Sequence, residues 1–171
     1  MACGAARLGL RTAFIGLVGK DELGRFMLEA MQKRDIDISH CVLDSDRETG
    51  LSVIVTQPDE RAILTHQGTM AALHIDHIDL DVLYRTRHLH VGSYFMLDAL
   101  RPDLPQLYAQ AKELGVTTSL DTNWDPAGSW NGGLDEMFPY VDVFMPNETE
   151  ACGSAGHRAM DQALDTLSAQ S

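Results

Sequence analysis

An amide and a carboxylate stand one helical turn apart in Pro146-Asn147-Glu148-Thr149-Glu150-Ala151, directly after an apolar run. Asn147 is a favoured N-cap residue, so a helix is expected to begin here and to present free N–H groups that attract anions. Glu148 and Glu150 would repel a phosphate bound directly to the helix end. They would not repel a phosphate if a cation lay between it and the carboxylates. We therefore expect Glu150 to hold hydrated Mg²⁺ through water, with Asn147 on the phosphate side. The same spacing is that of a capping box, which remains the alternative.

A second polar group ends the apolar run in Ser119-Leu120-Asp121-Thr122-Asn123. Side chains two residues apart on a strand share a face, so Asp121 and Asn123 are expected to point to the same side. There they would orient a phosphate–metal complex or a substrate hydroxyl. A turn is the alternative, because Asp, Asn and Pro126 are turn-forming residues. A phosphohydrolase built on Asp121 is disfavoured, because it would need Asp-x-Asp and position 123 is Asn.

Glycines surround a third candidate, residues 16–24. This segment resembles a nucleotide-binding loop, but it lacks both GxGxxG and the GKS or GKT ending of a Walker motif. A tight turn from strand to helix, with Asp21 as the helix cap, is the simpler interpretation.

The elements that must position these residues alternate between short apolar runs and amphipathic patterns. Strands are expected at residues 12–18, 88–92, 116–120 and 141–145. Helices are expected after Asp21, at 75–84, at 103–114 and after 147, the last broken near 153–156. Apolar residues Leu23, Phe26, Met27, Ala30 and Met31 predict one buried face for the first of these helices. Strands 51–56 and 62–66, joined by turn residues, predict an inserted hairpin.

This alternation predicts an α/β protein with right-handed βαβ units and a parallel sheet covered on both faces. In such sheets ligands bind beyond the carboxyl ends of the strands. Small or polar residues follow four of the expected strands, which predicts one rim of functional groups. These residues are Gly16, Gly19, Asp21, Gly92, Ser93, Asp121, Asn123, Asn147 and Glu150.

Composition narrows the class of protein. The chain has 171 residues, 44% of them hydrophobic and 22% charged, which is typical of a globular domain. Thirteen Lys and Arg against 25 Asp and Glu give a net charge of −12, which argues against nucleic acid and a polybasic membrane surface as partners. No apolar run approaches the ~20 residues of a membrane helix. Without a signal-peptide pattern or a CxxC pair, we expect a cytoplasmic protein with reduced thiols.

Four segments, in this order, resemble the ribokinase-like (PfkB-type) carbohydrate kinases. They are Ala5-Ala6-Arg7-Leu8-Gly9 with residues 12–24, Thr49-Gly50 with Asp59-Glu60-Arg61, Leu120-Asp121-Thr122-Asn123, and the Asn-x-x-Glu segment at 146–151. The resemblance implies a three-layer α/β/α fold with a mostly parallel, incomplete sheet and a small β lid hairpin at about 47–67. It also implies ATP-dependent phosphoryl transfer to a sugar hydroxyl with Mg²⁺, and it places Gly16, Gly19, Ser93 and Arg61 on the sugar side.

Two motifs of that family do not occur in the 171 residues: an initial Gly-Gly-x-x-x-Asn segment and a final Gly-x-Gly-Asp, whose Asp is the general base. Gly132-Gly133-Leu134-Asp135 precedes the Asn-x-x-Glu segment and stands in a different context. We therefore expect residues 1–171 to be one partial kinase domain that contains no catalytic base and turns over ATP negligibly. The alternative is a non-catalytic module that binds a partner through the hairpin, and we also expect the lid strands to favour a homodimer.

Overall fold

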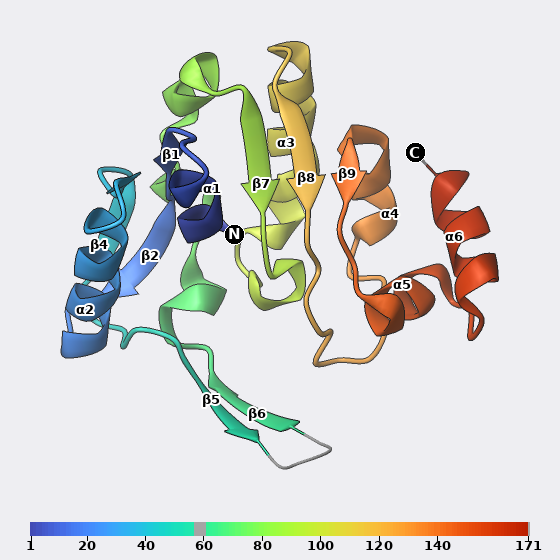
Figure 1. The fold of residues 1–171 in the computed structure, drawn as a ribbon, viewed down its shortest axis with the longest axis horizontal. Coiled ribbons are helices and arrows are strands. Elements are labelled where there is room, and N and C mark those ends of the chain that lie inside the picture. Colours follow the sequence, from blue (N-terminus) through green and yellow to red (C-terminus); the bar gives the residue numbers. More distant parts are fainter. Residues whose placement is uncertain (57–60, 171) are drawn as a thin grey trace. The chain divides into compact units, whose positions relative to one another are not determined.

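The computed structural model describes residues 1–56 and 61–170, with the backbone alone at Arg61. Its internal contacts divide the chain into two compact units, Met1–Asp79 and Leu80–Ser171, and each is described by itself. Figure 1 shows helices and short strands alternating along the chain in both units.

Two pairs of short parallel strands organise the first unit. After α1 (Ala2–Arg7), β1 (Thr12–Ala13) pairs with β3 (Ile36–Asp37), and β2 (Gly16–Gly19) pairs with β4 (Cys41–Asp44). A single strand was expected over residues 12–18, but the chain changes partner at residues 14–15. At this change the amide of Phe14 donates to the carbonyl of Asp37 over 2.8 Å, and the carbonyl of Phe14 accepts from the thiol of Cys41 over 3.3 Å.

Helix α2 (Glu22–Gln32) begins as the sequence predicts, because the side chain of Asp21 accepts a hydrogen bond from the amide of Gly24 over 2.7 Å. The prediction that one apolar face is buried is wrong in part. Phe26 is 71% exposed and Leu23 is 45% exposed. The helix contacts β2 through Gly24, the one fully buried residue that it contains, so these two side chains lie outside the contact.

The hairpin consists of β5 (Leu51–Thr56) and β6 (Arg61–His66), which pair antiparallel with Ile54 opposite Ile63. All side chains described on these two strands are exposed. Asp59 and Glu60 lie outside the described residues, as does the side chain of Arg61. The hairpin leads into two 3-10 helices, η1 (Gly68–Ala72) and η2 (Ile75–His77). The helix expected at 75–84 does not continue past His77, because Ile78 is extended; η3 (Leu80–Arg85) follows.

A parallel three-stranded sheet forms the centre of the second unit, in the order β7 (His88–Val91), β8 (Thr117–Leu120), β9 (Val143–Phe144). Helix α3 (Leu104–Glu113) packs on β8 with one apolar face. That face consists of the buried residues Leu104, Leu107, Tyr108 and Ala111. The hydroxyl of Tyr108 donates to the carbonyl of Ser119 over 2.8 Å, which joins helix to strand. Leu114, expected on the same face, is 42% exposed because the helix has ended.

Short helices complete the second unit. They are η4 (Tyr94–Met96), η5 (Arg101–Asp103), α4 (Leu134–Met137), η6 (Phe138–Tyr140), α5 (Glu148–Ala155) and α6 (Met160–Ser168). Gly156 ends α5 in the left-handed conformation, φ 69°, which produces the predicted break. The α/β class is confirmed, and every described strand pair is parallel except the hairpin. Among the described residues no helix has the length and apolar character to cross a membrane.

Candidate functional site

In the first unit, the carboxylate of Asp21 joins the end of β2, the start of α2 and the base of the hairpin. Its Oδ1 accepts from the amide of Gly24 over 2.7 Å and from the hydroxyl of Thr49 over 2.8 Å. Its Oδ2 accepts from the amide of Thr49 over 2.6 Å. The Thr49 hydroxyl oxygen in turn accepts from the amide of Gly19 over 3.0 Å. The hairpin therefore leaves the unit from an anchored point.

Hydrogen bonds to the charged form explain why this carboxylate stays ionised. The amides of Thr49 and Gly24 and the Thr49 hydroxyl hold the pKa of Asp21 below its usual value. Sequence reasoning found Asp21 as a helix cap but did not connect it to Thr49, which is 28 residues away. The available signal was Thr49-Gly50 at the start of the hairpin.

The structure gives Gly16 and Gly19 a packing role. A methyl group on Gly16 would lie 2.8 Å from the ring of Phe14, and one on Gly19 would lie 2.6 Å from the carbonyl oxygen of Arg47. Both glycines are buried in β2. At Gly19 the added methyl group would meet backbone, so the close approach of the neighbouring segment requires glycine there, whereas at Gly16 it would meet a side-chain ring that can shift. Their contact with a substrate stays a prediction.

In the second unit, Ser93, Asp121 and Asn123 lie together beyond the carboxyl ends of β7 and β8. Asp121 Oδ1 accepts from the amide of Asn123 over 2.9 Å, and Asn123 Nδ2 donates to Ser93 Oγ over 3.2 Å. Strand β8 ends at Leu120, so the two-residue alternation expected to align Asp121 with Asn123 does not extend to them. The turn that the sequence left as the alternative is the observed geometry.

Both Ser93 and Asn123 have left-handed backbone conformations, with φ 61° and φ 58°. Such conformations are uncommon outside glycine and concentrate at functional sites. Here they occur in facing segments, because the amide of Tyr94 donates to the carbonyl of Asp121 over 3.1 Å. The two polar side chains are therefore presented by two segments that are hydrogen-bonded to each other.

The start of α5 is a complete capping box. Glu150 donates its amide to Asn147 Oδ1 over 3.0 Å, and its Oε2 accepts from the amide of Asn147 over 3.0 Å. Glu150 Oε1 accepts from Asn147 Nδ2 over 2.7 Å. The whole Glu150 residue is 8% exposed. The alternative that the sequence left open is thus the geometry observed, and a role for Glu150 toward a metal stays a proposal.

This donor set fits a hydrated ion better than direct coordination. Each oxygen of Glu150 already accepts one hydrogen bond but keeps a second lone pair, which a metal-bound water could use. Asp121 Oδ2 accepts no hydrogen bond within the described part of the chain. Across residues 1–56 and 61–170, no group of three or more His, Cys, Asp or Glu side chains is arranged to hold a metal ion.

Sequence reasoning missed Asp125, which organises the loop after Asn123. It is 3% exposed and accepts from the amides of Ala127 and Trp130 over 2.9 and 2.6 Å and from the hydroxyl of Ser129 over 3.1 Å. The ring of Trp130 then stands edge-on to Trp124, 5.1 Å between centroids. The only sequence signal was the turn-forming pair Asp125-Pro126.

Two histidines occupy one face of the second unit's sheet. His88 Nε2 and His90 Nδ1 lie 2.7 and 2.8 Å from Ser119 Oγ on the neighbouring strand. Burial lowers the pKa of His90, and the nearby Asp121 carboxylate opposes that shift. These side chains join β7 to β8 next to the rim that carries Asp121.

The fold and this rim define an α/β protein whose polar residues follow the carboxyl ends of neighbouring parallel strands. The chain belongs to the pfkB family carbohydrate kinases, whose sequence pattern matches residues 1–170. A 5-dehydro-2-deoxygluconokinase of Mesomycoplasma hyopneumoniae (strain 232) is 32% identical over 158 residues, covering 90% of this chain and 46% of that protein. The chain thus spans about half the length of the curated relatives it matches.

Solved structures show the same fold. The PfkB protein from Polaromonas sp. JS666 matches with a TM-score of 0.85 and 23% identity, covering 99% of this chain and 60% of that one. A fructokinase from Vibrio cholerae O395, in a form bound to fructose, ADP and calcium ion, matches with a TM-score of 0.81 and 24% identity, covering 99% and 57%. The ribokinase-like fold expected from the sequence is confirmed.

Proposed function

We propose that this chain is part of an ATP-dependent carbohydrate kinase, in which the γ-phosphoryl group of ATP passes to a sugar hydroxyl. Membership of the pfkB family supports this proposal, because the similar curated proteins include a 5-dehydro-2-deoxygluconokinase and a ribokinase. The observation that carries it is the rim of the second unit. There Ser93, Asp121 and Asn123 lie beside the N-terminus of α5, since β7, β8 and β9 are parallel neighbours.

Within this proposal both units belong to one kinase domain, and the hairpin at about 47–67 is its lid. Gly16, Gly19, Ser93 and Arg61 are assigned to the sugar side. Asp121, Asn123 and Asn147 are assigned to the phosphate side, where side-chain amides and α5 amides suit anionic oxygens. No general base is proposed among these 171 residues, so they contribute positioning and charge rather than proton transfer.

Mg²⁺ would neutralise charge on the phosphates when bound, and Glu150 would hold it through water. The capping box positions the Glu150 carboxylate for this role. Its two hydrogen bonds from Asn147 hold the carboxylate at the helix start. Asp121, which follows the neighbouring strand β8, would provide a second negative oxygen for the hydrated ion through its Oδ2.

Binding of Mg²⁺–ATP tests this proposal. We expect Mg²⁺–ATP to raise the melting temperature of the chain more than ATP with EDTA, because only the hydrated ion engages Glu150. Glu150→Gln removes the charge but can keep the reciprocal backbone bonds of the capping box, because its single side-chain oxygen can still accept from the amide of Asn147. It should weaken Mg²⁺–ATP binding about tenfold, or about 1.4 kcal/mol, measured by calorimetric titration.

Glu148→Gln is the matched control, because Glu148 is an exposed carboxylate in the same helical turn. It makes the same change in charge and should leave Mg²⁺–ATP affinity unchanged. Equal weakening by both substitutions would show a general electrostatic effect, and no stabilisation of the unsubstituted chain by Mg²⁺–ATP would count against the kinase proposal.

A second candidate function is self-association through the hairpin. Apolar side chains stand on both faces of the two strands, including Val53, Ile54, Val55, Ile63 and Leu64, each 47–66% exposed. Exposed apolar strands pair readily with other strands. The proposed partner is a second copy of this chain, which would form a homodimer whether or not ATP is bound.

The double substitution Ile54→Ser with Ile63→Ser tests this interface, because the two residues are directly opposite across the hairpin. We expect sedimentation velocity to show a shift from dimer to monomer at micromolar concentration. Ser52→Thr with Thr65→Ser is the control, since this opposed polar pair keeps its hydroxyl groups. A dimer that survives the Ile substitutions would exclude the hairpin as the interface.

A further inference from the structure

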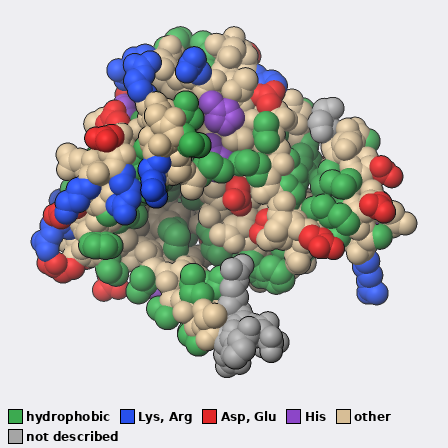
Figure 2. All heavy atoms as spheres, viewed as in Figure 1, with side chains coloured by type: hydrophobic (Ala, Val, Ile, Leu, Met, Phe, Trp, Pro, Cys, Tyr) green, Lys and Arg blue, Asp and Glu red, His purple; other side chains and the backbone are tan. Residues whose placement is uncertain are grey.

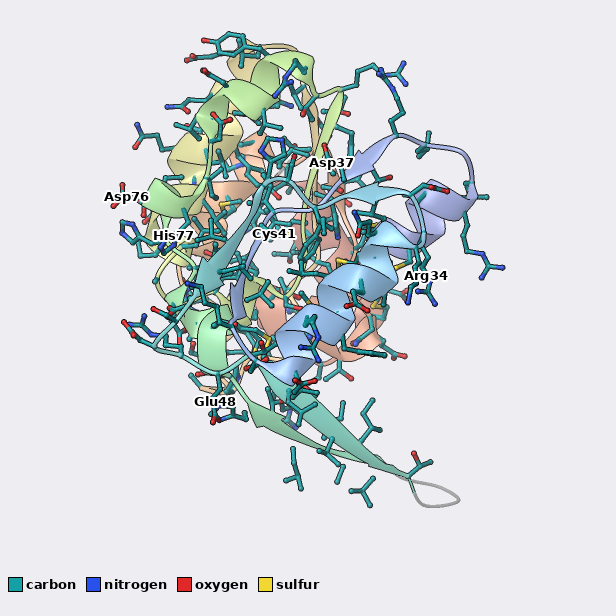
Figure 3. All side chains as sticks on the ribbon, turned by 90° about the vertical axis from the view of Figure 1, so that its left-hand side faces the viewer. Arg34, Asp37, Cys41, Glu48, Asp76 and His77 are labelled. Carbon is teal, nitrogen blue, oxygen red and sulfur yellow. The ribbon has the colours of Figure 1, made fainter. Side chains whose placement is uncertain are left out.

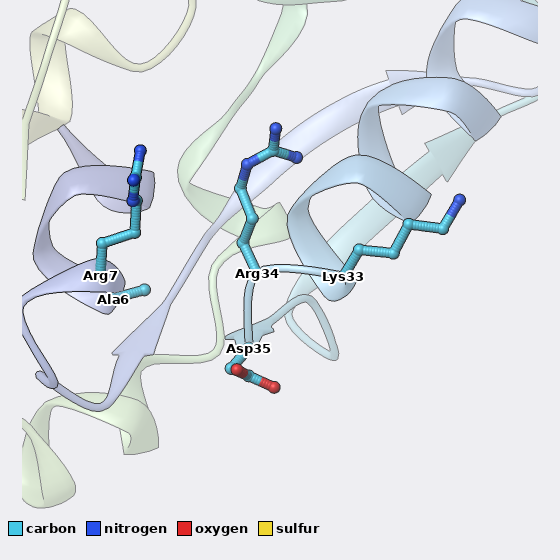
Figure 4. Close-up of a pocket in the computed structure, with 5 residues that line it drawn as sticks. All are labelled: Ala6, Arg7, Lys33, Arg34 and Asp35. Carbon is cyan, nitrogen blue, oxygen red and sulfur yellow. The ribbon is translucent and has the colours of Figure 1, made fainter.

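An open pocket of about 610 Å³ lies in the first unit, where the last turns of α1 and α2 come together. It is lined by Ala6, Arg7, Lys33, Arg34 and Asp35. Figure 4 shows the side chains of Arg7 and Arg34 extending in the same direction from the two helix ends, with Lys33 projecting to one side. Three cations thus border one hollow in a protein whose net charge is −12.

Helix geometry accounts for part of this arrangement. Carbonyl groups at a helix C-terminus carry a partial negative charge, so Arg and Lys are favourable there. Arg34 uses this effect, since its Nη1 donates to the carbonyl of Ala30 over 2.7 Å. Arg7 also lies in the last turn of its helix, α1, but its side chain makes no hydrogen bond or ion pair with any described residue. Lys33 approaches Glu29 at 4.0 Å, the limit of an ion pair.

Four other described cations each have a carboxylate partner. Arg25, Arg47, Arg101 and Lys112 pair with Glu22, Asp44, Asp98 and Asp142. Arg7 and Arg34 differ because they border the same pocket with most of their N–H donors unused. Figure 2 shows Lys and Arg side chains gathered over the part of the molecule that Figure 1 draws as α1 and α2.

Asp35 adds an acceptor at the opposite side of this pocket. Its backbone is left-handed, φ 57°, at a helix end where glycine is the usual residue. Its carboxylate points away from the two guanidinium groups in Figure 4. A carboxylate in that place suits a hydroxyl group rather than a second anionic group.

We propose that this pocket binds a phosphorylated sugar or polyol. The phosphate dianion lies between the Arg7 and Arg34 guanidinium groups, whose planar N–H donors match phosphate oxygens. A hydroxyl of the same ligand donates to Asp35. The volume of the pocket, about 610 Å³, lies within the range of small-molecule sites.

Within the first unit, the pocket lies away from Gly19, which is assigned to the sugar side. It lies at the C-terminal end of α2, whereas Gly19 and Asp21 precede the N-terminal end. The 11 residues of α2 separate these ends by about 16 Å. Figure 3 shows Arg34 at the end of α2 that lies away from the hairpin. The inference does not rest on the proposed kinase function.

Calorimetric titration at constant ionic strength tests the proposal, with D-glucose 6-phosphate, inorganic phosphate and D-glucose as probes. We expect glucose 6-phosphate to bind more tightly than phosphate, and glucose not to bind at this pocket. Arg7→Gln and Arg34→Gln should each weaken glucose 6-phosphate binding at least tenfold. Asp35→Asn should weaken glucose 6-phosphate but leave inorganic phosphate unchanged.

Arg25→Gln is the matched control, because Arg25 lies on α2 outside the pocket. It removes the same charge and should leave binding unchanged. Weakening by Arg25→Gln equal to that by Arg34→Gln would overturn the proposal, as would binding that survives Arg7→Gln and Arg34→Gln. If Asn123→Ala abolished glucose 6-phosphate binding instead, the ligand would lie at the rim of the second unit, and the proposal would also be overturned. A purely structural role for the cations would change the melting temperature without ligand but not the affinity.

Discussion

Gly24→Ala is expected to destabilise the chain by about 3 kcal/mol, although alanine is the better helix former. A methyl group at this position would overlap the carbonyl oxygen of Gly19 and lie 2.8 Å from both Thr49 Oγ1 and Val18 Cγ1. The backbone of β2 cannot move away without losing the contacts of Asp21. Urea denaturation followed by far-UV circular dichroism measures the loss.

Gly4→Ala provides the control for this prediction. Gly4 also lies in a helix, but nothing stands within 4 Å of the added methyl group. That substitution should be neutral or should stabilise by about 0.5 kcal/mol. If Gly24→Ala behaved like Gly4→Ala, the close packing of α2 on β2 described above would be wrong.

Asp125→Ala is expected to lower the free energy of unfolding by about 3 kcal/mol and to loosen the loop that carries both tryptophans. The substitution removes the acceptor for the amides of Ala127 and Trp130 and for the Ser129 hydroxyl. Because Trp124 and Trp130 are the two tryptophans of the chain, the change should appear as a shift of the emission maximum to longer wavelength. Asp135→Ala is the control, since Asp135 is exposed and accepts from Asn131 alone among described side chains.

At acid pH the free energy of unfolding of Asp125→Asn should approach that of the unsubstituted chain. Burial raises the pKa of Asp125, but hydrogen bonds from Trp130, Ala127 and Ser129 outweigh it and hold the pKa below the usual value. The charged form therefore stabilises the fold fully above about pH 4, the pKa of an unfolded Asp. That stabilisation is lost as the pH falls through the lowered pKa of the folded state. Denaturation curves at pH 7, 5, 4 and 3 measure this convergence, and a constant difference would contradict it.

Residue types and their spacing were enough to predict the class of fold and the order of its elements. Apolar residues spaced at 104, 107, 108 and 111 predicted α3 and its buried face, because one side of that helix packs on β8. The hairpin was also predictable from local sequence, because two runs rich in β-forming residues with turn residues between them are typical of a β-hairpin. Local spacing also identified Asp21 and Asn147 as helix caps.

Tertiary structure decided what these residues touch. Thr49 reaches Asp21 across 28 positions, a contact that no local pattern encodes. The burial of α2 could not be judged from periodicity, because which of its apolar side chains meets a neighbour depends on how closely Gly24 approaches β2. The sequence could place Asp121 near Asn123 but not choose between a strand and a turn. That choice depends on where β8 stops: after Leu120 the carbonyls of Asp121 and Thr122 accept from the amides of Tyr94 and Phe95, and the backbone then becomes left-handed at Asn123.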